Sequence, residues 1–254
     1  GTVLDLDNTA NLNDAESGEE SVFVTGSDIL FPATASNYNV VVSNAHGAVS
    51  ANSITFDNAS KPYYLSGDSI VGAPTVTKKG DGSVYINNEN RTGNTYITQG
   101  NLYVSSLANT TGTDYGALGD KSKVINISNG ARLGISNTLV SDQAISVGEG
   151  GAGVTVANGA TFTQNAAVTG GSGTTFTKTG EGTFAMPSSF APSTLSIVGG
   201  TVNGYDSKGP ANIDFRGGTY SDSNSEGTYS KLSSNFIVEK GQTGKLILDP
   251  RCQY

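Results

Sequence analysis

Residues 75–84, Thr-Val-Thr-Lys-Lys-Gly-Asp-Gly-Ser-Val, return with small changes at residues 175–184 as Thr-Phe-Thr-Lys-Thr-Gly-Glu-Gly-Thr-Phe. A looser third copy occupies residues 236–246. All three copies contain a strand-like segment, a lysine, a glycine-containing turn and a second strand-like segment. Successive side chains of a strand point to opposite faces, and glycine adopts the positive φ angles of tight corners without steric cost. The motif therefore predicts two short strands joined at a sharp corner.

A second unit recurs as well. Residues 125–133, Ile-Asn-Ile-Ser-Asn-Gly-Ala-Arg-Leu, resemble residues 154–162, Val-Thr-Val-Ala-Asn-Gly-Ala-Thr-Phe. Such short units cannot bury their own apolar face and must stack on their neighbours. We therefore predict an all-β fold, a right-handed parallel β-helix (β-solenoid), whose inward side chains form apolar columns. Thr, Ser, Asn and Lys are expected to point outward.

Apolar residues alternate with polar ones over four to six residues, and helical spacing is nearly absent. The strands expected from this pattern are Val22–Val24, Tyr38–Val42, Ser53–Phe56, Ser83–Ile86, Asn101–Val104, Val124–Ile127, Thr174–Thr177 and Asn235–Val238. Residues 1–20 are expected to form an N-terminal cap or flexible segment, and residues 21–254 the solenoid repeat domain. We expect this domain to be part of a longer protein.

The amino-acid composition argues against several classes of protein. Of the 254 residues, 35% are hydrophobic and only 14% are charged, which favours a folded chain. The net charge of -8, with 14 scattered Lys and Arg residues, argues against nucleic-acid binding. No apolar run approaches the ~18 residues of a membrane-spanning helix. A single cysteine, Cys252, rules out a disulfide within the chain.

Several segments resemble the autotransporter-associated β-strand repeat. They are residues 76–86 with 94–104, residues 175–184, and residues 116–119 followed by 124–133; residues 26–31, 38–40 and 53–67 follow the order seen upstream in that family. The resemblance spans residues 20–185 in patches. It implies a β-helix passenger of a secreted or cell-surface bacterial protein, acting in adhesion, in aggregation or as a stalk. The repeat of that family contains no catalytic residues that could be transferred to this chain.

We expect a non-enzymatic protein without a cofactor. His46 is the only histidine, and no partner serine or second metal ligand marks a triad or a zinc site around it. Carboxylates are the remaining candidates for catalysis. Asp68, Asp81, Asp114 and Asp120 would meet if the coils aligned them on one face, so a polysaccharide lyase or hydrolase is the alternative.

Calcium is a second alternative. Asp5, Asp7, Thr9, Asn11, Asn13 and Glu16 have the spacing of oxygen ligands in an EF-type loop. However, Ala10 stands where such a loop needs glycine, and no flanking helices are predicted. A plain acidic segment explains the same residues, and no metal site is expected.

Tyrosines are the best candidates for recognition. Tyr85, Tyr96 and Tyr103 fall within about one repeat, where their rings can stack on sugars. Stacking on one another in a β ladder is the favoured interpretation. The expected partners are a glycan or protein on a host or neighbouring cell, and other domains of the parent chain. The expected location is extracellular, secreted or on the cell surface.

Overall fold

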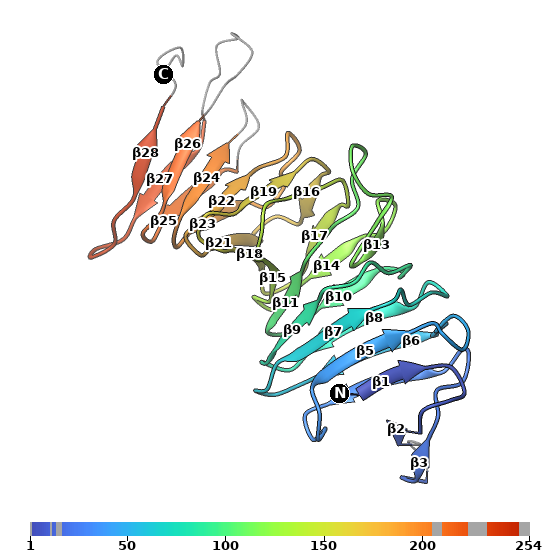
Figure 1. The fold of residues 1–254 in the computed structure, drawn as a ribbon. Coiled ribbons are helices and arrows are strands. Elements are labelled where there is room, and N and C mark those ends of the chain that lie inside the picture. Colours follow the sequence, from blue (N-terminus) through green and yellow to red (C-terminus); the bar gives the residue numbers. More distant parts are fainter. Residues whose placement is uncertain (1, 11, 14–16, 205–209, 223–232, 249–254) are drawn as a thin grey trace. The chain divides into compact units, whose positions relative to one another are not determined.

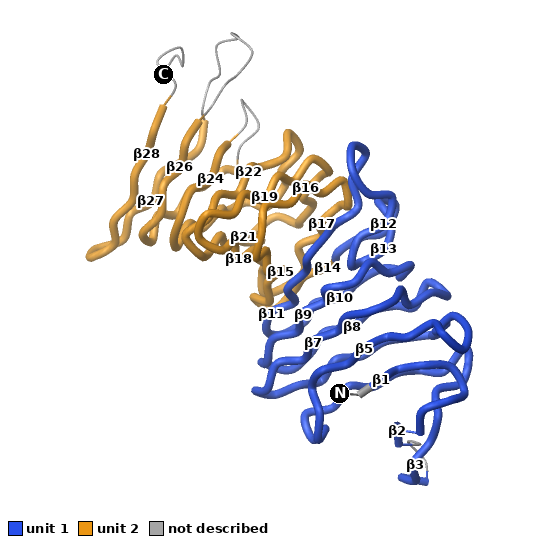
Figure 2. The backbone as a smooth tube through the Cα atoms, in the orientation of Figure 1, with its two compact units in different colours: residues 1–125 blue, residues 126–254 orange. Residues whose placement is uncertain are grey.

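The computed structural model describes residues 2–10, 12–13, 17–204, 210–222 and 233–248 (Figure 1). Every regular element in these ranges is a β-strand. The chain divides into two compact units, residues 1–125 and 126–254 (Figure 2). In each unit, stacked parallel strands form a β-solenoid, which confirms the predicted all-β parallel β-helix. The described residues include no helix that could cross a membrane.

Unit 1 contains two parallel sheets. Sheet I consists of β1 (Thr2–Asp5), β5 (Asn39–Ser43), β7 (Tyr63–Gly67), β9 (Ser83–Ile86) and β11 (Asn101–Val104). Sheet II consists of β4 (Asp28–Pro32), β6 (Ser53–Asp57), β8 (Thr75–Lys79) and β10 (Thr95–Ile97). Two antiparallel pairs accompany them, β2 (Leu12–Asn13) with β3 (Glu20–Ser21) and β12 (Tyr115–Gly116) with β13 (Gly119–Asp120).

Unit 2 contains three parallel sheets. Sheet III consists of β15 (Arg132–Ile135), β18 (Ala152–Val156), β21 (Thr175–Thr179), β23 (Thr194–Ile197), β25 (Asn212–Phe215) and β27 (Asn235–Val238). Sheet IV consists of β16 (Leu139–Ser141), β19 (Thr161–Gln164), β22 (Thr183–Ala185), β24 (Thr201–Gly204), β26 (Thr219–Asp222) and β28 (Lys245–Ile247). Sheet V contains β17 (Ile145–Val147), β20 (Val168–Gly170) and β14 (Ile125–Ile127), which begins at the last residue of unit 1.

The neighbours in each sheet are strands from successive coils, not strands that follow one another in the chain. β7 pairs in parallel with β9, for example, although β8 lies between them in the sequence (Figure 1). Parallel neighbours need a long crossover connection, and the rest of the coil supplies it. This arrangement places equivalent residues of successive coils side by side.

The register of the parallel strands aligns the inward apolar side chains of successive coils into buried columns. In sheet I, Val40, Leu65, Ile86 and Val104 lie opposite one another in turn. None of these side chains is more than 4% exposed. Full burial of an aliphatic side chain of this size contributes about 1.5–3 kcal/mol. The columns therefore hold each coil to the next through every layer of the unit.

An aromatic cluster forms part of the core of unit 1. The rings of Phe31 and Phe56 are stacked with centroids 4.7 Å apart, and the Tyr63 ring lies 5.3 Å from that of Phe31. Tyr63 is 1% exposed, and its hydroxyl donates a hydrogen bond of 2.7 Å to the carbonyl oxygen of Pro32. Burial raises the pKa of Tyr63 to about 12. The cluster combines apolar burial with a satisfied polar group.

Lys78 and Lys178 depart from the expected outward orientation. Lys78 stands in an inward column between Phe56 and Ile97, and Lys178 in one between Val154 and Ile197. Both lysines are fully buried. Their side chains are long enough for the ammonium groups to donate hydrogen bonds to the backbone carbonyls of the glycine corners at Gly80 and Gly180.

Most of the expected strands are confirmed, either with the expected boundaries or with an end shifted by one or two residues. The expected strand at Val22–Val24 is wrong. β3 ends at Ser21, and only Phe23 pairs further, through an isolated parallel bridge to Leu6. The antiparallel pairing of β3 with β2 takes this part of the chain out of the parallel ladder. Within residues 1–20, β1 adds a parallel strand beside β5.

Candidate functional site

An open groove of about 340 Å³ lies on the outer face of sheet III in unit 2. Six of its seven lining residues are polar or charged, and they come from three successive coils. The lining residues are Thr175, Thr177, Thr194, Ser196, Val198, Asp214 and Arg216. We call this feature the sheet III groove.

The register of the parallel strands assembles the groove. Thr175 lies opposite Thr194, and Thr177 lies opposite Ser196, which in turn lies opposite Asp214. Because side chains alternate between faces, these residues point outward while Phe176, Leu195 and Ile213 enter the core. Outward rows of short hydroxyl side chains thus leave a depression over β21, β23 and β25.

An acidic side chain forms part of the floor of the groove. Asp214 is only 7% exposed, although it is on the outer face of the sheet. Its Oδ2 accepts a hydrogen bond of 2.7 Å from Arg216 Nε and one of 3.3 Å from the hydroxyl of Ser196. Arg216 also contacts Glu239, with Nη2 3.3 Å from Oε1. Hydrogen bonding to Asp214 and the charges of both carboxylates raise the pKa of Arg216.

The other oxygen of this carboxylate is unpaired. Asp214 Oδ1 is buried and has no hydrogen-bond partner among the described residues. A buried acceptor without a donor costs about 1–3 kcal/mol. The neighbouring hydroxyls and guanidinium, by contrast, line the groove and offer both donors and acceptors to a ligand there.

This groove is not among the sites predicted from the sequence. The available signal is the segment Asn212-Ile213-Asp214-Phe215-Arg216, in which polar residues alternate with two large apolar ones. Strand periodicity alone predicts that Asn212, Asp214 and Arg216 share an outer face. The threonines and the serine that complete the groove come from other coils, so only the register brings them to Asp214.

The structure separates the three candidate tyrosines. Tyr85 and Tyr103 lie opposite each other on the outer face of sheet I, with ring centroids 4.7 Å apart and an interplanar angle of 10°. Tyr64 extends the stack, with its ring centroid 4.9 Å from that of Tyr85. We call these three residues the tyrosine ladder. Tyr96 belongs to sheet II and is 40% exposed. Stacking within the ladder covers the faces of the Tyr85 ring.

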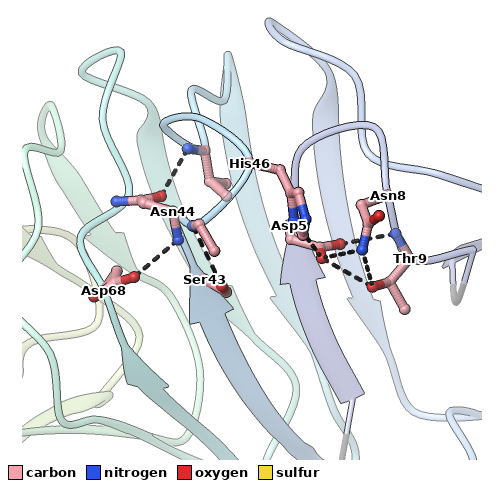
Figure 3. A network of polar contacts seen from close by, with 9 residues as sticks. Asp5, Asn8, Thr9, Ser43, Asn44, His46 and Asp68 are labelled. Carbon is pink, nitrogen blue, oxygen red and sulfur yellow. Dashed lines mark hydrogen bonds and ion pairs between the residues drawn. The ribbon is translucent and has the colours of Figure 1, made fainter.

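Figure 3 shows the surroundings of Asp5, the first residue of the candidate calcium loop. Its carboxylate accepts hydrogen bonds of 2.9 Å from the backbone N–H and the hydroxyl of Thr9, and one of 3.2 Å from the Asn8 amide. The Nδ1 atom of His46 lies 3.6 Å from Asp5 Oδ2. Burial alone would raise the pKa of Asp5, but these donors and the imidazole together lower it.

Donors from the protein itself therefore bind both oxygens of the Asp5 carboxylate. Asp7 has a φ of 51°, and Asn13 belongs to β2. Asn11 and Glu16 lie outside the described residues. Across the described ranges, no three His, Cys, Asp or Glu side chains come together in a way that could hold a metal ion.

Of the alternative catalytic set Asp68, Asp81, Asp114 and Asp120, three carboxylates have separate local partners. Asp68 accepts a hydrogen bond of 2.8 Å from the backbone of Asn44 (Figure 3), and Asp81 accepts one of 2.8 Å from the Gln99 amide. Asp120 binds Ser122 and lies 3.6 Å from Lys123 Nζ. These three contacts are within unit 1 and serve its loops and corners.

Comparison of the chain with models of known families, with curated proteins and with solved structures gave no match.

Proposed function

We propose that this chain is a non-enzymatic segment of a secreted or cell-surface bacterial protein, of the β-helix passenger type, that acts in adhesion or as a stalk. One observation carries the proposal. The lysine-glycine corner, which is the motif most typical of the autotransporter-associated repeat, forms the same local structure in both units. At Gly80 and at Gly180, a buried lysine binds the corner carbonyl and the glycine has a positive φ.

The architecture supports a load-bearing role. Each unit is held by coil-to-coil backbone ladders and by continuous buried columns, so its resistance to bending is distributed over all layers. Short strands with glycine corners can be repeated without a change of cross-section. A solenoid of this kind suits a stalk that holds a distal domain away from a cell.

The outer faces support an adhesive role. In unit 1, sheet I carries the tyrosine ladder, and in unit 2, sheet III carries a polar groove. Aromatic side chains and arginine are enriched at recognition surfaces. The proposed partners are glycans or proteins on a host or neighbouring cell, together with other domains of the parent chain.

Two experiments test location and adhesion. Antibodies raised against the purified chain should label intact cells of the source bacterium as strongly as permeabilised cells. Beads coated with the chain should adhere to bacterial or epithelial cell layers, whereas beads coated with the heat-unfolded chain should not. Labelling restricted to permeabilised cells would contradict the proposed location.

The proposal also excludes turnover of polysaccharides. The purified chain, incubated with pectin, polygalacturonate and neutral glucans, should produce no new reducing ends and no unsaturated uronate absorbance. Depolymerisation that tracked with the chain through purification would instead favour a polysaccharide-active enzyme on the same scaffold.

A further inference from the structure

We propose that the sheet III groove binds a neutral, hydroxyl-rich glycan, with Asp214 and Arg216 as the central recognition pair. This inference deepens the adhesive function proposed above and rests on it. It names both the surface of the molecule that does the binding and the class of ligand.

The size and the chemistry of the groove fit a short saccharide. Its volume of about 340 Å³ is at the lower end of the range of small-ligand sites. Thr175, Thr177 and Thr194 present hydroxyls from two adjacent strands. A hydroxyl both donates and accepts hydrogen bonds, as do the hydroxyls of a sugar. The lining therefore matches a ligand whose polar groups are neutral and closely spaced.

Asp214 supplies the carboxylate that lines the groove. Its Oδ1 atom is buried without a partner among the described residues, while Oδ2 already binds Arg216 and Ser196. A sugar hydroxyl can donate to this carboxylate while the adjacent hydroxyl accepts from the guanidinium. Arg216 is 43% exposed, so its side chain can turn toward a ligand.

The charge of the groove favours binding of a neutral glycan over an acidic one. Asp214 and Glu239 both contact the single guanidinium of Arg216, which leaves this cluster with an excess of negative charge. A uronate or sialate carboxylate placed here would be repelled. Val198, which is 42% exposed at the groove, offers an apolar contact for the C–H face of a sugar ring.

Titration calorimetry on the full chain tests the inference, with oligosaccharides of glucose, mannose and galactose as neutral probes and a galacturonate oligomer as the acidic probe. We expect at least one neutral probe to bind, and Asp214→Asn to weaken that binding about tenfold, as expected for a hydrogen bond to a charged group. Thr194→Val, which keeps the side-chain shape, should weaken it by about threefold. Thr201→Val, on sheet IV of the same unit, should bind as the unsubstituted chain does.

A second measurement does not depend on variants. Saturating the unsubstituted chain with the bound probe should slow backbone hydrogen exchange in β23 and β25 and leave sheet I unchanged. Three results would each overturn the inference: tighter binding of the galacturonate oligomer, unchanged affinity in folded Asp214→Asn and Thr194→Val, or protection elsewhere. If the beads still adhered to cells but no neutral probe bound, the sheet III groove would not be the glycan site, whereas the proposed adhesive function would still hold.

Discussion

The ammonium group of Lys178 donates a hydrogen bond of 2.6 Å to the carbonyl oxygen of Gly180, two residues further along the chain. A second bond of 2.9 Å runs to the carbonyl of Gly199, at the corresponding corner of the next coil. In unit 1, Lys78 makes equivalent contacts with Gly80 and Gln99. A buried charge is costly unless it is well hydrogen-bonded, and here two stacked corners supply the acceptors. The lysine therefore joins neighbouring coils at the point where both chains turn.

Replacement of either buried lysine by methionine should destabilise its unit. The Lys178→Met variant keeps most of the apolar stem but leaves the corner carbonyls without a donor. We expect a loss of about 1–3 kcal/mol in the free energy of unfolding, measured by urea denaturation. Lys79→Met is the matched control, because Lys79 is half-exposed and pairs with Asp57 only at the surface; its effect should stay within about 0.5 kcal/mol. Equal effects of the two substitutions would contradict the role of burial.

The same lysines predict an increase in stability in mildly alkaline solution. Burial lowers the pKa of Lys78 and Lys178 to about 8, from the ordinary value of 10.5. Between these pH values the unfolded state binds more protons than the folded state, so the free energy of unfolding rises with pH. The rise should be seen from about pH 8 to about pH 9.5 and should be absent in the Lys78→Met, Lys178→Met double variant. Above pH 10 ionisation of tyrosine in the unfolded state acts in the opposite direction, since the pKa of Tyr63 is raised.

Two buried tyrosines should respond in opposite ways to loss of the hydroxyl. The hydroxyl of Tyr220 is buried without a hydrogen-bond partner among the described residues, whereas that of Tyr63 donates to Pro32. Tyr220→Phe should stabilise the chain by about 1 kcal/mol, and Tyr63→Phe should destabilise it by a similar amount. Thermal unfolding followed by circular dichroism distinguishes the signs. A loss of stability in Tyr220→Phe would mean that its hydroxyl has a partner.

The tyrosine ladder predicts different contributions to stability from Tyr85 and Tyr96, two tyrosines that lie within about one repeat of the sequence. Tyr85 stacks on both of its neighbours, while Tyr96 is on sheet II. Each aromatic pair contributes about 0.5–1.5 kcal/mol beyond burial, so Tyr85→Ala should cost about 1–3 kcal/mol. Tyr96→Ala should cost clearly less. The near-ultraviolet circular dichroism of the ladder should also decrease in Tyr85→Ala only.

Acid should loosen the N-terminal coil through Asp5. Hydrogen bonds from Thr9 and Asn8 outweigh burial and lower the pKa of this carboxyl. The stabilisation is therefore present above the ordinary pKa of 3.8 and is lost as the pH falls through the lower value of the folded state. Hydrogen-exchange protection factors in β1, corrected for the intrinsic exchange rate, should fall below about pH 4, and Asp5→Asn should remove most of that pH dependence. Asp81→Asn, at an exposed carboxylate, should leave it unchanged.

Local sequence determined most of the strands and the glycine corners. Strands such as Ser83–Ile86 and Asn101–Val104 have the predicted boundaries, because period-two alternation and a preceding glycine act over a few residues. Gly80 and Gly180 adopt φ angles of 79° and 75°. An added Cβ at Gly180 would collide with the backbone of Val156 in the preceding coil. The repeat therefore places glycine where the chain turns a sharp corner and where the preceding coil leaves no room for a side chain.

Two features could not be predicted locally. Lysine next to a glycine turn is usually solvated, and only the stacking of a second corner above the first provides enough acceptors to bury it. The sheet III groove combines Thr177, Ser196 and Asp214, which are distant in the sequence and meet through strand register. A shift of one residue in the register of either strand pair would turn the outward side chains of the shifted strand toward the core.

By itself, the sequence determined that this protein consists of short parallel strands with glycine corners, because steric preference and alternation are properties of a few consecutive residues. The tertiary structure alone decided which lysines enter the core, which tyrosines stack and which hydroxyls surround Asp214. Those contacts depend on the register between coils, and the register is set by the burial of whole apolar columns.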